Sequence, residues 1–183
     1  MFSKTKLRGL MMYMLLIFFI TQYIYSKENI CNTAIECEEK GVKMLEKEEY
    51  SESILYFDKA IQLISKEDKV LLSKLYYLKG ESYFYLRRYD ESLRNIEKAI
   101  SINPKYGRAY YGRGAIYILV FGRYEKAIED LNKAIELDPD YAEAYIARGA
   151  AYARLKQYTK AIEDFNKAIE LRPDYAEAYT NRG

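Results

Sequence analysis

Small and apolar residues recur at three- and four-residue intervals through most of this chain, with charged residues between them. The pattern is clearest in two adjacent segments near the C-terminus: Tyr145, Gly149 and Tyr152 in the first, and Ala161, Phe165, Ala168 and Ile169 in the second. This is the spacing of an amphipathic helix. It predicts two helices joined by a turn at residues 155–158. The second helix should end before Pro173, because proline lacks a backbone N–H and disfavours helix in the preceding residue.

The predicted helix pair is repeated along the chain. Residues 127–149 and 161–183 align with an offset of 34 residues and differ at four of 23 positions. A period of this length is typical of solenoids, in which each unit buries its apolar face against the next.

Within a unit, the first helix carries an aromatic residue, an Arg-Gly pair and a tyrosine, and the second carries Ala-x-x-x-Phe before a proline. This pattern resembles the tetratricopeptide repeat. Tyr145 stands where the family has tryptophan and Arg148 where it has leucine, and the Arg-Gly form recurs at residues 113–114 and 182–183, which marks a sub-type. The resemblance implies an all-α fold, a right-handed superhelical solenoid of antiparallel helix pairs with a concave face.

The repeats divide the chain into units of unequal regularity. We predict a degenerate repeat at 34–67, repeats at 73–106, 107–141 and 142–175, and a truncated fifth repeat at 176–183. The third has one extra residue, in the turn near Gly122. Because solenoid ends normally need a cap over their apolar face, the unfinished repeat suggests a fragment of a longer array or an end covered by a partner.

Residues 1–26 have a different character from the repeats. Lys4, Lys6 and Arg8 precede an apolar run that extends over residues 9–25, and no acidic residue occurs in this segment. Two alternatives stay open: a cleaved secretory signal peptide, with Ser26 before the cleavage site, and an uncleaved membrane anchor through 9–25. Either places the repeats on the non-cytoplasmic side of a membrane, after a linker at 27–33. The residues before Cys31 do not resemble a lipoprotein motif, so no lipid anchor is expected.

Composition narrows the classes of function. The chain has 29 basic and 27 acidic residues, and without the three N-terminal cations the net charge is −1. Bulk charge therefore does not favour a nucleic-acid partner. The chain has no histidine, the commonest general base and a frequent metal ligand, and it has no glycine-rich phosphate loop. We therefore predict no enzymatic activity, no cofactor, no metal and no small-molecule substrate.

The two cysteines, Cys31 and Cys37, are six positions apart. Six residues of helix rise about 9 Å, which is too far for a disulfide if both are helical. We therefore expect a buried Cys37 and an incidental Cys31.

The resemblance implies which side chains line the concave face. They come from the first helices of successive repeats: Lys74, Tyr77, Glu81, Phe84, Tyr85, Arg108, Tyr111, Ile118, Leu119 and Arg154. The rings and aliphatic side chains would anchor a peptide, and the cations would hold acidic groups at the rim. In the alternative, these rings pack on neighbouring helices or contact the N-terminal segment.

Two further patterns have simple interpretations. Family members that hold a chaperone's C-terminal carboxylate use Lys, Asn and Arg at set positions, and only Arg108 fits here, so no carboxylate clamp is expected. Glu129-Asp130/Lys133 and Glu163-Asp164/Lys167 repeat with the unit, which favours a solvated helix face with i,i+4 pairs.

The sequence thus favours an exported or membrane-anchored, non-enzymatic scaffold that binds a peptide or helix of a partner protein in its concave groove. The alternative is the docking or sensory arm of a longer enzyme truncated at residue 183.

Overall fold

The predicted all-α solenoid is confirmed. The computed structural model describes residues 31–174 and 180, and eight helices occupy this part of the chain. In order they are α2 (Ala34–Glu46), α3 (Tyr50–Leu63), α4 (Lys69–Tyr85), α5 (Tyr89–Ile102), α6 (Gly107–Leu119), α7 (Tyr124–Leu137), α8 (Ala142–Arg154) and α9 (Tyr158–Leu171). The signal or anchor segment, the truncated fifth repeat and the Arg-Gly pair at 182–183 lie outside the described residues, apart from Thr180.

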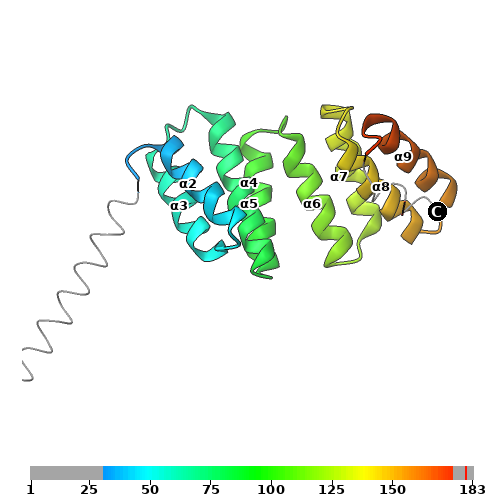
Figure 1. The fold of residues 1–183 in the computed structure, drawn as a ribbon, viewed down its shortest axis with the longest axis horizontal. Helices are drawn as coiled ribbons and strands as arrows, with labels where there is room; N and C mark the ends of the chain where they lie inside the picture. The colour runs from blue at the N-terminus through cyan, green and yellow to red at the C-terminus, as the bar shows by residue number, and fades with distance from the viewer. Residues whose placement is uncertain (1–30, 175–179, 181–183) are drawn as a thin grey trace, which may run out of the picture.

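The helices pack as four pairs, α2 with α3, α4 with α5, α6 with α7 and α8 with α9, and each pair stacks on the next. Figure 1 shows the pairs following one another along an elongated array, from the blue and cyan N-terminal pair to the orange and red C-terminal pair. Among residues 31–174 and 180, no helix has the length and apolar content needed to span a bilayer.

Glycine lets the two helices of a pair approach closely. A Cβ on Gly149 of α8 would lie 2.6 Å from the ring of Phe165 in α9, and one on Gly41 of α2 would lie 2.5 Å from the ring of Phe57 in α3. Both rings are buried. A contact between a glycine and an aromatic ring therefore lies at the centre of each of these two pairs.

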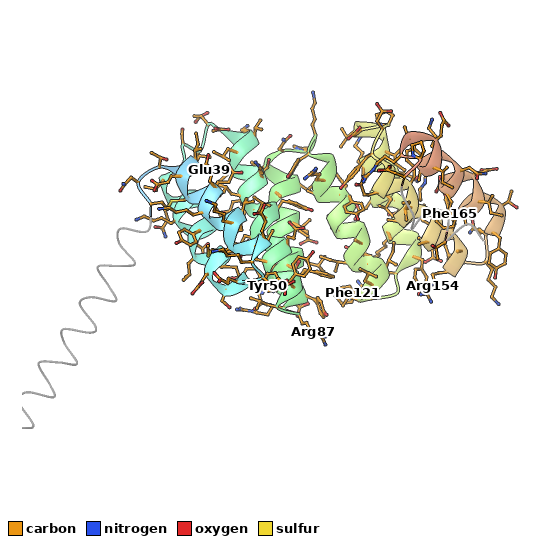
Figure 2. All side chains as sticks on the ribbon, in the orientation of Figure 1. Glu39, Tyr50, Arg87, Phe121, Arg154 and Phe165 are labelled. Carbon is orange, nitrogen blue, oxygen red and sulfur yellow. A yellow bond between two sulfur atoms is a disulfide. The ribbon has the colours of Figure 1, made fainter. Side chains whose placement is uncertain are left out.

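The turn inside each pair follows one plan. In the first, second and fourth pairs, the second residue after the end of α2, α4 and α8 has positive φ: Glu48 (62°), Arg87 (59°) and Lys156 (59°). The next N–H then bonds back to the helix, as when Arg88 donates to the Tyr83 carbonyl at 2.9 Å, which is a Schellman motif. The third pair has the longer turn, and there Gly122 adopts the positive φ of 59°. Figure 2 shows Tyr50, Arg87, Phe121 and Arg154 along the edge of the array formed by these turns.

The expected burial of Cys37 is confirmed, but the expectation of an incidental Cys31 was wrong. Cys31 and Cys37 form a disulfide, with their Cα atoms 5.3 Å apart, and both are buried. The helix begins only at Ala34, where the Thr33 hydroxyl accepts the Glu36 N–H. Because Cys31 therefore lies before the helix, the chain can fold back and bring it to Cys37.

The solvated acidic face was also wrong in part. Asp130 and Asp164 are each 6% exposed. Arg113 donates two hydrogen bonds to Asp130 (2.8 and 2.7 Å), and Arg148 donates two to Asp164 (2.8 and 2.6 Å). The expected partners of the lysines also change, because Lys133 pairs with Glu136 and Lys167 with Glu170 at i,i+3 spacing. The arginine of the Arg-Gly pair thus joins the two helices of its own repeat.

Candidate peptide-binding groove

Two apolar depressions lie side by side on the first helices of the repeats. The first, about 230 Å³ in volume, lies between α4 and α6, and the second, about 170 Å³, lies between α6 and α8. They share Tyr111, Ala115 and Leu119 of α6. Glu81, Phe84, Tyr85, Ile96, Gly112 and Ile116 complete the first, and Ile118, Glu143, Ile146, Ala147 and Ala150 complete the second. We refer to these two depressions together as the groove.

The side chains at the rim of the groove are unusually accessible for their type. Leu119 is 71% exposed and Tyr85 is 51% exposed, whereas Phe84, Tyr111 and Ile118 are half-buried. The Tyr85 ring is held between Tyr50, which stacks on it at 4.9 Å, and Phe84, which meets it edge-on at 5.7 Å. Tyr50 was missed from the sequence. It belongs to the row of tyrosines that begin the second helix of each repeat, and that row is the signal that points to it.

Tyr77 does not lie on the open surface of the groove. It is 8% exposed and meets Tyr106 edge-on at 5.6 Å. The ring occupies space that a side chain at position 112 would fill, because a Cβ on Gly112 would lie 2.9 Å from Tyr77 Cε2. Burial also raises the pKa of its hydroxyl well above the ordinary value. For Tyr77, then, the alternative of packing on neighbouring helices is the correct one.

The predicted cations occupy three different settings. Lys74 is paired with Glu38 at 2.5 Å. Arg108 is exposed and lies beside a more polar hollow with Tyr106, Tyr141 and Glu143. Arg154 is exposed at the C-terminus of α8. None of the three lines either apolar depression.

The groove contains acidic side chains as well. Glu143 pairs with Arg172, which follows α9. Glu81 is half-buried in the first depression. Burial raises the pKa of the Glu81 carboxyl, and the positive charge of Arg108 partly opposes that increase.

Six of the ten predicted groove residues line the depressions, namely Glu81, Phe84, Tyr85, Tyr111, Ile118 and Leu119.

The geometry is that of a contact surface. Within residues 31–174 and 180, no group of three or more acidic or cysteine side chains is arranged to hold a metal ion. The two depressions together form an apolar strip across three successive repeats, with polar groups at its edges. Stacked helix pairs with such a strip define a helical-repeat protein.

Comparisons with known proteins identify the repeat. A model described as tetratricopeptide repeat matches residues 73–106 and 142–175, and one described as TPR repeat matches residues 122–156. Residues 73–106 and 122–175 of the chain thus match models of the tetratricopeptide repeat.

Its relatives are similar over different lengths. The mitochondrial import receptor subunit TOM70 of Homo sapiens is 31% identical over 85 residues, which are 46% of this chain and only 14% of the receptor. The first TPR of Spaghetti (RPAP3), solved bound to the HSP90 peptide SRMEEVD, is 28% identical with a TM-score of 0.58 over 60% of this chain and 86% of that one. A crystal structure of MamA matches with a TM-score of 0.67 at 24% identity, over 85% of this chain and 86% of that one, and shows the shared fold.

Proposed function

We propose that this protein is a non-enzymatic scaffold that binds a peptide or helix of a partner protein in the groove. The observation that carries the proposal is the apolar strip around α6, where Leu119 is 71% exposed. An exposed apolar strip of this kind is typical of an interaction site. Each depression is smaller than the roughly 300 Å³ at which small-molecule pockets begin, and this size suits single side chains of a peptide.

The likeness to the peptide-bound repeat of RPAP3 supports the class of partner. It does not extend to the acidic peptide found there, because only Arg108 corresponds to the cations of a carboxylate clamp. The proposed partner is therefore an internal or basic segment instead of an acidic C-terminus.

A random twelve-residue peptide library, displayed on phage and selected against the full chain, tests the groove. Leu119→Gln removes the most exposed apolar contact, and we expect the selected peptides to bind this variant about 10- to 100-fold more weakly, as the loss of one buried leucine predicts. Val70→Gln is the matched control, because Val70 is 72% exposed at the start of α4 and lines neither depression. Equal binding of the selected peptides to Leu119→Gln and to the wild type would mean that the groove is not the site.

We also propose that the repeats act outside the cytoplasm, after export or while anchored through residues 9–25. The Cys31–Cys37 disulfide supports this location, because disulfides persist mainly in oxidising compartments. Expression of the full chain in a secreting host, followed by mass spectrometry of its N-terminus, separates the two routes. Cleavage after Ser26 leaves a chain that begins at Lys27, whereas an anchor leaves residues 9–25 in the membrane fraction. Recovery of an uncleaved chain in the cytosol, with both thiols free, would exclude both.

A further inference from the structure

Glu81 differs from Glu143, the other acidic side chain that lines the groove, and from Glu38 of α2. Glu38 is paired with Lys74 at 2.5 Å, and Glu143 is paired with Arg172. Glu81 lies half-buried beside Phe84, Ile96 and Tyr111. Within residues 31–174 and 180, no cation lies within ion-pairing distance of its carboxylate, and Arg108 acts on it only at longer range. One acid of the groove thus lacks a counter-charge of its own.

A half-buried carboxylate without a cation is unfavourable. Removing water from the charged carboxylate costs free energy. Only a nearby opposite charge or hydrogen-bond donor offsets that cost. Burial raises the pKa of Glu81 for the same reason, because it disfavours the charged form of the carboxyl group. Because Glu81 lines the first depression and is only half-buried, a bound segment can supply the missing positive charge.

We infer that the segment bound in the groove carries a lysine or arginine that pairs with Glu81, next to apolar side chains that fill the two depressions. This inference rests on the proposed function and specifies its partner. An acidic segment would instead place a second negative charge beside the Glu81 carboxylate, which is unfavourable. The exposed cations Arg108 and Arg154 do not reverse this preference, because they remain solvated outside the two depressions.

The spacing of the anchors follows from the position of α6. The depressions lie on either side of this helix, and a helix with its side chains is about 10–12 Å wide. Two anchors about 10 Å apart are seven positions apart in a bound helix or three apart in an extended segment. The cation lies beside the anchor that enters the first depression.

The same library, selected separately against three forms of the full chain, tests the inference. For the wild type, we expect selected peptides with two apolar residues at one of these spacings and a lysine or arginine beside one of them. Glu81→Gln keeps the size of the side chain and should remove the enrichment of basic residues while it retains that of apolar residues. Glu129→Gln is the control, because Glu129 is exposed on α7 and lies outside the groove, and it should leave both enrichments unchanged.

A second measurement does not depend on the folding of a variant. One selected peptide is synthesised with its basic residue and with glutamine in that place, and both are titrated against the wild-type full chain. We expect the glutamine form to bind about 10- to 100-fold more weakly, as for a lost hydrogen bond to a charged group.

The outcomes separate the inference from the proposal beneath it. Selection of apolar peptides without basic residues, basic enrichment that persists with Glu81→Gln, or equal binding of the two synthetic peptides would overturn the inference alone. Selection of no peptide, or of peptides that still bind Leu119→Gln, would overturn the proposed function as well.

Discussion

The two halves of the solenoid join their helix pairs by different polar contacts. In the C-terminal half, a buried aspartate on the second helix accepts two hydrogen bonds from an arginine on the first, at Arg113–Asp130 and Arg148–Asp164. The equivalent positions in the N-terminal half hold Lys40 and Tyr56, and Lys79 and Asn95. There, serine hydroxyls form buried hydrogen bonds instead, each at 2.7 Å: Ser92 donates to the Gly80 carbonyl within the second pair, and Ser53 bonds to Ser82 between the first and second pairs.

The packing beneath these contacts is the same in both halves. Gly41 lies against Phe57 in the first pair as Gly149 lies against Phe165 in the fourth. In the second and third pairs the glycine lies against an aliphatic side chain instead, Gly80 against Ile96 and Gly114 against Leu131. Helix approach is therefore set by a glycine against a large apolar side chain, and the polar contacts can be exchanged without a change of fold. They should differ in what they contribute to stability, since hydrogen bonds to charged groups are about twice as strong as neutral ones.

The largest effect should come from breaking a buried ion pair in the C-terminal half. Asp164→Ala leaves the Arg148 guanidinium, whose side chain is 19% exposed, without its carboxylate, and we expect a loss of about 3 kcal/mol in the free energy of unfolding. Urea unfolding monitored by circular dichroism measures it. Glu170→Ala breaks an exposed pair with Lys167 and should cost less than about 1 kcal/mol. Equal losses for the two variants would contradict the comparison.

Removal of the disulfide should affect only the N-terminal half. The Cys31–Cys37 bond closes a short loop, and its loss should cost about 2 kcal/mol by the loop-entropy relation. Because a solenoid's repeats contact only their neighbours, Cys31→Ala should speed amide hydrogen exchange in α2 and α3 and leave α8 and α9 unchanged. Faster exchange throughout the array would show that the two halves unfold as one unit.

A smaller effect is expected from a serine. Ser92→Ala removes the buried hydroxyl that donates to the Gly80 carbonyl, and it should cost about 1 kcal/mol. The two C-terminal repeats already have alanine at this position, Ala127 and Ala161. Calorimetry of Ser92→Ala beside Asp164→Ala ranks the two kinds of contact directly, and a larger loss for the serine would reverse the order proposed here.

The smallest effect on the free energy of unfolding should come from Glu81 of α4, close to where the two halves meet. Its pKa is raised above the ordinary 4.5 by burial, so the folded state holds this proton more tightly than the unfolded state does. The contribution of Glu81 to stability is complete below pH 4.5 and is lost as the pH rises through the raised pKa.

Glu81→Gln removes that dependence, and the variant should be at least as stable as the wild type at pH 7. The charged and titratable groups that act on the site, Arg108, Tyr77 and Tyr106, remain in both proteins. Unfolding of both proteins from pH 4 to pH 8 isolates the difference. A variant that is less stable at pH 7 would show that the Glu81 carboxylate stabilises the fold.

The periodic features of this molecule could be predicted from the sequence because each depends on one repeat and its neighbour. Gly149 is small enough to allow close approach of the second helix of its repeat, and the structure has that approach, with Phe165 against Gly149. The helix pairs follow from the same period, whereas the groove residues were expected from the resemblance to the family.

Features that depend on the exact start of a helix or on an absent side chain could not be predicted in this way. Tyr77 is buried because the facing residue is Gly112 instead of a residue with a Cβ. Cys31 reaches Cys37 because the helix begins three residues later than Cys31. The burial of Asp164 had a signal that was missed: an arginine precedes it by 16 positions, and the same pair recurs at Arg113 and Asp130 with the inserted residue between them.

The guanidinium of Arg148 has a consequence for how the protein can change in length. Besides Asp164 in its own repeat, it donates to Asn132 of the preceding repeat at 2.7 Å, and the residue equivalent to Asn132 one repeat later is Asn166. A duplicated copy of residues 142–175 inserted before Ala142 would present its arginine to Asn132 and its asparagine to Arg148. Each junction would keep the residue types of this arginine–asparagine contact, so we expect the array to tolerate the gain of a 34-residue module by gene duplication.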